Sequence, residues 1–66
     1  MLLVEAKMLP NDNYMLLSFI NMKLRDFYDS LDDLCFDLDE NIDDIVSRLD
    51  SIDYVYDEKP NQFITK

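Results

Sequence analysis

The sequence predicts a mainly α (α+β) fold in which three helices form a bundle and a β-hairpin follows at the C-terminus. Three segments repeat apolar residues at intervals of three and four, the period of an amphipathic helix. Each begins close to an Asp, Ser or Asn, whose side chains cap helices. After residue 53 the pattern becomes that of two short strands around a turn. We expect an N-terminal arm over residues 1–12 and one small domain over residues 13–66.

The first helix, predicted over residues 13–28, is the longest apolar segment and the expected centre of the core. Pro10 breaks any regular element before it, and Asp12 is the expected N-cap residue, with Asn13 as the second choice. The inward-facing stripe comprises Leu17, Ile20, Leu24 and Phe27, with Leu16 and Tyr28 widening it. This spacing places the stripe on one face of the helix, which we expect to be buried.

A second apolar set on the first helix is formed by Met15, Phe19 and Met22. These residues stand at i, i+4 and i+7, so they share a face about a third of a turn away from the stripe. One interpretation is that the N-terminal arm or the hairpin covers them. The other is that they form a partner surface for a second copy or another protein, since Met and Phe are enriched at such surfaces.

The second and third helices are shorter. Ser30 is the expected N-cap of a helix that starts at Leu31, and Asp33 follows it in the pattern of a capping box. The inward residues of this helix are Leu31, Leu34, Cys35 and Leu38, while Phe36 lies off that face. Asn41 or Glu40 opens the third helix, whose inward residues are Ile42, Ile45, Val46, Leu49 and Ile52.

The C-terminal segment predicts a hairpin. Residues 54–56 (Tyr-Val-Tyr) favour a strand, residues 57–61 with Pro60 form the turn, and residues 62–65 return as a second strand. Because a two-stranded hairpin is not stable alone, it must lie against the helices.

Charge is the most informative part of the composition. The chain carries a net charge of −9, and twelve of its fifteen acidic residues lie between residues 29 and 58, where Arg48 is the only basic residue. Asp43, Asp44 and Asp50 form the candidate acidic face on the third helix. This face is either a solvated surface that keeps a small protein soluble or a binding surface for a basic partner. It repels nucleic acids and anionic membranes.

Three helices followed by a hairpin are the arrangement of a winged-helix or helix-turn-helix domain. In a DNA-binding member, the third helix presents basic or amide side chains to the bases. Here its outward residues are Asp43, Asp44, Ser47, Arg48, Asp50 and Ser51. Three aspartates against one arginine argue against nucleic-acid binding.

The residue types also argue against catalysis and against metal or cofactor sites. The chain has no His, one Cys and no Gly, so imidazole chemistry, an intrachain disulfide and a Gly-rich phosphate loop are excluded. Asp37, Asp39 and Asn41 match the start of a calcium loop, but Ile42 and Arg48 stand where that loop needs Gly and Glu. We expect no enzyme activity, no metal and no cofactor.

The N-terminal sequence and the single cysteine suggest where the protein acts. The first residues lack the basic start of a signal peptide, and their apolar run breaks at Glu5. No segment approaches the length of a membrane span. An unpaired Cys35, expected to be a buried structural thiol, fits a reducing compartment. We expect a cytoplasmic protein.

Four short motifs carry a resemblance to a known family: MLLS (15–18), NMKLRD (21–26), SLDDLC (30–35) and NQF (61–63). With them the chain resembles the family called domain of unknown function 4250 over residues 8–63. The resemblance implies a small, non-secreted bacterial protein and assigns no functional residue. It also implies that Gly is common at the position of Asp53, just before the hairpin, where a left-handed residue follows the helix.

The leading functional hypothesis is a non-catalytic protein-interaction module that self-associates or holds a partner through Met15, Phe19 and Met22. On this hypothesis Phe19→Asp abolishes association and leaves a folded domain. The alternative is an acidic decoy or regulator that occupies the basic surface of a nucleic-acid-binding protein. Binding of that kind weakens steeply as salt rises.

Overall fold

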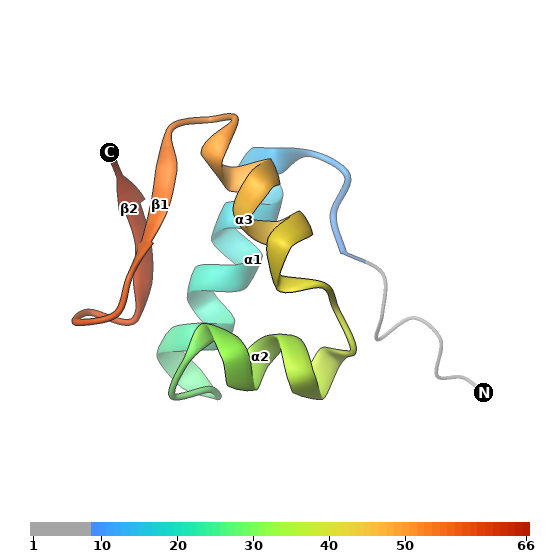
Figure 1. Cartoon of the computed structure of the whole chain (residues 1–66), viewed down its shortest axis with the longest axis vertical. Helices are drawn as coiled ribbons and strands as arrows, with labels where there is room; N and C mark the ends of the chain where they lie inside the picture. Colours follow the sequence, from blue (N-terminus) through green and yellow to red (C-terminus); the bar gives the residue numbers. More distant parts are fainter. Residues whose placement is uncertain (1–8) are drawn as a thin grey trace.

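The longest helix, α1 (Asn13–Asp26), contacts both other helices and the hairpin in the computed structural model, which describes residues 9–66. Residues 1–8 of the predicted N-terminal arm lie outside the described part. The other elements are α2 (Leu31–Leu38), α3 (Ile42–Asp50), β1 (Tyr54–Asp57) and β2 (Gln62–Thr65). Figure 1 shows the three helices gathered on one side of the hairpin. The predicted fold class is confirmed.

Each helix begins at the predicted capping residue. The Asp12 carboxylate accepts hydrogen bonds from the backbone N–H groups of Tyr14 (2.7 Å) and Met15 (3.3 Å). Ser30 accepts one from the N–H of Asp33, and the Asn41 side chain accepts bonds from the first turn of α3. These bonds satisfy N–H groups that have no partner within the helix.

Nine side chains of the described residues form the buried core. They are Leu16, Ile20, Leu24, Leu31, Leu34, Cys35, Ile45, Leu49 and Phe63. Leu17, placed in the predicted stripe of α1, is only partly buried, while Leu16 is fully buried. The buried face of α1 is therefore rotated toward Leu16. The predicted inward residue Val46 of α3 is 39% exposed, and Phe36 is 89% exposed, which confirms its position off the buried face of α2.

The predicted end of α1 is wrong. The helix ends at Asp26, and Phe27 leaves the helical conformation with φ −129°. The N–H groups of Phe27 and Tyr28 both donate to the carbonyl of Lys23, which closes the last turn. Phe27, expected in the core stripe, is consequently 66% exposed, and Tyr28 packs against the core instead.

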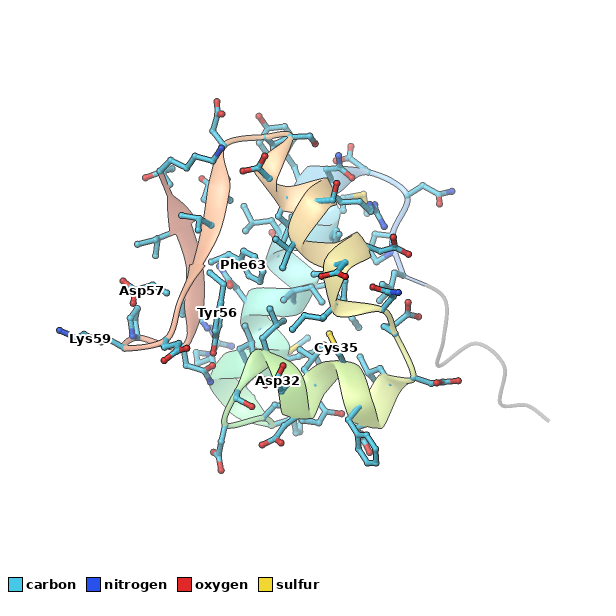
Figure 2. The ribbon with its side chains drawn as sticks, viewed as in Figure 1. Asp32, Cys35, Tyr56, Asp57, Lys59 and Phe63 are labelled. Carbon is cyan, nitrogen blue, oxygen red and sulfur yellow. The ribbon has the colours of Figure 1, made fainter. Side chains whose placement is uncertain are left out.

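The hairpin places one aromatic face against the helices. Strands β1 and β2 pair antiparallel, with Tyr56 opposite Phe63 and Val55 opposite Ile64. The rings of Tyr56 and Phe63 lie 5.5 Å apart at an interplanar angle of 52°. Figure 2 shows both side chains pointing toward the helices, whereas Asp57 and Lys59 point away. The hairpin thereby completes the core with Phe63.

Within residues 9–66 of this Gly-free chain, three positions have the left-handed backbone conformation that favours glycine. They are Asp39 (φ 57°), Asp53 (φ 69°) and Asn61 (φ 56°). Asp and Asn are the residues after Gly that best tolerate this conformation. Asp39 ends α2, Asp53 joins α3 to the hairpin and Asn61 ends the hairpin turn. The left-handed residue implied at Asp53 is present.

Candidate functional site

The three residues of the predicted partner surface differ in their exposure. Met15 is 62% exposed on α1. Phe19 and Met22 are partly buried, and Phe19 packs against the core. Met15 is thus the apolar side chain of this set that is available for contact, while Phe19 also supports the fold.

Lys23 extends this surface along α1. Its ammonium group lies 5.5 Å from the ring centre of Phe19 and 4.8 Å from that of Phe27. A cation at these distances over aromatic rings is attracted to them. We call Met15, Phe19, Met22, Lys23 and Phe27 the α1 patch. The spacing of three and four residues predicted a shared face for Met15, Phe19 and Met22 alone. Phe27 was predicted in the buried stripe, and it joins this surface because α1 ends before it.

The predicted acidic face of Asp43, Asp44 and Asp50 is exposed on α3. Asp50 forms an ion pair with the ammonium of Lys66, and the hydrogen bond in this pair raises the pKa of Lys66. Asp43 and Asp44 form no ion pair within the described part of the chain. They lie in the first turn of the helix, where its dipole favours negative charge.

Arg48, the outward basic residue of α3, is engaged in the fold. Its guanidinium donates to the side-chain oxygen of Asn13 (2.8 Å) and to the carbonyls of Pro10 (2.6 Å) and Asn11 (2.9 Å). It therefore fastens the segment before α1 to α3. A residue held in this way is poorly placed to read bases or phosphates.

The residues that resembled a calcium loop have other contacts. Asp37 accepts a hydrogen bond from the Tyr28 hydroxyl, and this bond is the main cause that raises the pKa of Tyr28. Asn41 caps α3, and Asp39 has the left-handed conformation at the end of α2. Over residues 9–66, no group of three or more Asp, Glu, Cys or His side chains is arranged to hold a metal ion.

Asn21 joins α1 to β2. Its side-chain oxygen accepts a hydrogen bond from the N–H of Phe63 (2.7 Å), and its nitrogen donates to the carbonyl of Phe63 (3.0 Å). Gln62 donates to the carbonyl of Asn21 (2.9 Å). The side chain of Asn21 therefore binds β2 as a neighbouring strand would. Asn21 and Gln62 lie in motifs that carry the family resemblance, but no local pattern predicts that they meet.

Asn61 joins the hairpin turn to the end of α1. Its amide nitrogen donates to the carbonyls of Leu24 (3.1 Å) and Tyr28 (2.9 Å), and its oxygen accepts from the Tyr56 hydroxyl. The same hydroxyl accepts a hydrogen bond from the N–H of Leu31 (3.3 Å). A carbonyl at the end of a helix lacks a partner within the helix, and Asn61 supplies one. Sequence reasoning missed this role.

Cys35 is a free, buried cysteine. Burial raises the pKa of its thiol, and the negative charges of Asp32 and Glu40 raise it further. The thiol is therefore protonated at neutral pH. A protonated, buried thiol packs as a small apolar group and is a poor nucleophile.

A groove of about 530 Å³ separates the end of α1 from the hairpin turn. Arg25, which lines it, is paired with Asp26, and Asn61 is occupied by backbone carbonyls. The pairing with Asp26 raises the pKa of Arg25, and the same hydrogen bond lowers the pKa of Asp26. Because the side chains of Arg25, Asp26 and Asn61 are already hydrogen-bonded within the protein, they are poorly available to orient a small molecule in the groove.

The hydropathy of the helices and the comparisons with known proteins also bear on function. Within residues 9–66 no helix is long and apolar enough to span a membrane. No curated protein and no solved structure matches the chain. The sequence pattern of one family, described as Domain of unknown function (DUF4250), matches residues 10–63, which is most of the chain. The chain therefore belongs to the DUF4250 family.

Proposed function

We propose that this protein is a non-catalytic protein-interaction module that self-associates through the α1 patch. The observation that carries the proposal is the exposed Met15 on α1 and the exposed Phe27 directly after the end of α1, 62% and 66% exposed, with Lys23 between the rings of Phe19 and Phe27. Met, aromatic side chains and a cation over aromatic rings are features of protein interfaces.

The distribution of charge supports pairing through α1. Residues 29–58 carry a net charge of −11, and the remaining residues carry +2. Two copies that meet through α1 bring together the less acidic parts of the chain, which reduces the repulsion between molecules of net charge −9. The same charge, together with the engagement of Arg48, supports a function without nucleic acid. The single cysteine, which can form no disulfide within the chain, supports a cytoplasmic location.

The test compares two neighbouring substitutions on α1. Met15 and Tyr14 are each 62% exposed but point in directions about 100° apart on the helix. Met15→Lys places a charge within the α1 patch, and Tyr14→Lys makes the same change of charge outside it. Phe19→Asp is a poorer test, because Phe19 also packs against the core.

Sedimentation equilibrium over a range of concentrations measures the association. We expect Met15→Lys to weaken it about tenfold or more, as expected for a charge placed in an apolar contact, and Tyr14→Lys to leave it nearly unchanged. Circular dichroism establishes that both variants are folded. A wild-type chain that stays monomeric at the highest concentration, or equal effects of the two substitutions, would contradict the proposal.

The alternative proposal is an acidic decoy or regulator that occupies a basic protein surface. It is favoured by the exposed Asp43 and Asp44, which have no ion-pair partner in the described residues. Its test is capture of partners from lysate of the native cells at stepwise salt. A basic partner released at moderate salt, and captured less by the Asp43→Asn, Asp44→Asn variant, supports this function. Self-association through the α1 patch instead strengthens with salt, because screening reduces the repulsion between copies.

A further inference from the structure

The two edges of the hairpin differ in their hydrogen bonding. At the outer edge of β2, the N–H and C=O of Phe63 are both bound by the side chain of Asn21. The helix α1 therefore covers the middle of this edge. No other strand pairs with β1 in the described part of the chain, because its sheet contains β1 and β2 alone.

The direction of the backbone groups of β1 follows from the same bonds. The N–H and C=O of one strand residue point to the same side, so Phe63 directs both away from β1. Phe63 lies opposite Tyr56. Because the backbone groups of Phe63 point away from β1, the two residues form a non-hydrogen-bonded pair, and the N–H and C=O of Tyr56 point away from β2. The pairs alternate, so Tyr54 does the same. In this alternation Asp53, one residue before Tyr54, directs its backbone groups toward the other strand. Its carbonyl does accept a hydrogen bond from the N–H of Lys66.

Tyr54 and Tyr56 thus present four backbone groups at the outer edge of β1. Within residues 9–66, none of the four has a hydrogen-bond partner. Strand edges are commonly protected by Lys or Pro, and β1 contains neither. This edge can accept an added strand, a common mode of peptide recognition.

The charges around β1 indicate what such a strand must carry. Asp53 precedes β1, Asp57 ends it and Glu58 follows. A second copy of β1 paired antiparallel about Val55 would place Asp53 opposite Asp57. Like charges directly opposite one another are destabilising, so charge disfavours a second copy and favours a basic strand.

We propose that the outer edge of β1 binds an extended basic segment of a partner protein by strand addition. The residue of the segment opposite Val55 is apolar, because it lies on the outward face beside Val55 (42% exposed) and Ile64 (40% exposed). The residues two positions to either side are Lys or Arg, opposite Asp53 and Asp57. This surface is separate from the α1 patch and does not depend on it.

The probe is a peptide with blocked ends and the sequence Lys-Thr-Val-Thr-Lys. In the added strand the two Thr residues lie opposite Tyr54 and Tyr56 and exchange hydrogen bonds with them, while the N–H of the central Val points away. Methylation of the two Thr nitrogens removes the donors to β1. Methylation of the Val nitrogen is the matched control, because it changes a group that does not face the protein.

Binding is measured by NMR at low salt on the full chain labelled with ¹⁵N. We expect the unmodified peptide to shift the amide signals of Tyr54 and Tyr56 and to slow their hydrogen exchange. Methylation at both Thr residues weakens binding about tenfold or more through loss of two hydrogen bonds, and methylation at Val changes it less than about twofold. Asp53→Asn with Asp57→Asn weakens binding about threefold, as expected for exposed ion pairs.

Three results would overturn the inference. Equal binding of the two methylated peptides would indicate attraction by charge alone. Slower exchange of Tyr54 and Tyr56 with rising protein concentration, without peptide, would assign the edge to a second copy. No shift at the solubility limit of the peptide would exclude the site. Met15→Lys is expected to leave peptide binding unchanged, so failure of this inference and failure of the α1 patch are distinguishable.

Discussion

At the scale of single residues, Asn21 shows how one side chain can take the place of a strand. It satisfies both backbone groups of Phe63, whose side chain is almost completely buried in the core. Without this amide, two backbone groups beside the core would have to find water or stay unpaired. The position of β2 on α1 therefore depends on a polar contact as well as on apolar packing.

We predict that Asn21→Ala lowers the free energy of unfolding by about 1–3 kcal/mol, the usual effect of leaving partly buried polar groups unpaired. Ser18→Ala is the control on the same helix, since Ser18 is exposed and its side chain makes no hydrogen bond to the residues that the structure describes. Urea unfolding measures both variants, and amide exchange at Phe63 should become faster in Asn21→Ala. Equal stability of the two variants would show that Asn21 does not hold the hairpin.

At the scale of the elements, the connections depend on left-handed residues that are not glycine. Asp53 and Asn61 have nearly the same φ, 69° and 56°, but their side chains differ in what they bind. The side chain of Asn61 bonds to two carbonyls of the α1 end and to Tyr56. No hydrogen bond to the Asp53 side chain is present among residues 9–66. Substitution by Gly at both sites therefore separates the energetic effect of the backbone conformation from that of the side-chain hydrogen bonds.

We predict that Asp53→Gly raises the free energy of unfolding by about 0.5–1 kcal/mol, because Gly relieves the steric cost of the left-handed conformation. Asn61→Gly should instead lower it by about 2 kcal/mol or more, because several hydrogen bonds are lost. Thermal and urea unfolding measure both, with Asp53→Ala as a control that should destabilise. Stabilisation by Asn61→Gly would contradict the role assigned to its side chain.

At the scale of the whole molecule, charge opposes folding. The chain carries a net charge of −9, and several exposed acidic residues, such as Asp29 and Glu58, have no ion pair within the described part. Repulsion among like charges destabilises a compact state, and salt screens it. A small domain buries little surface, so its free energy of unfolding is small and this repulsion lowers it noticeably.

We predict that the midpoint of thermal unfolding rises by a few degrees between about 20 mM and about 300 mM NaCl, since the screening length falls to roughly 10 Å or less over this range. The variant Asp29→Asn, Glu58→Gln carries two fewer negative charges and should show a smaller rise. Calorimetry at fixed pH measures both. A midpoint that falls with salt would show that favourable ion pairs outweigh the repulsion.

The elements and their order follow from local patterns in the sequence. The caps Asp12, Ser30 and Asn41 and most of the buried residues follow from local rules, because a helix requires N-terminal acceptors and an apolar face of fixed period. The hairpin follows in the same way from its strand-forming residues and turn. The family was also recognisable from short motifs, since these are properties of the chain itself.

The contacts that join these elements, and the surfaces that stay exposed, depend instead on tertiary packing. The exposure of Phe27 depends on where α1 stops, and the availability of Met15 depends on what packs over its neighbours. The contacts of Asn21 and Asn61 with the hairpin and α1 join residues some 40 positions apart in the sequence. Local periodicity carries no information about such pairs, because a hydrogen bond between distant segments depends on how whole elements pack. For the same reason, the edge of the hairpin that stays open depends on tertiary packing, because Asn21 of α1 binds the outer edge of β2.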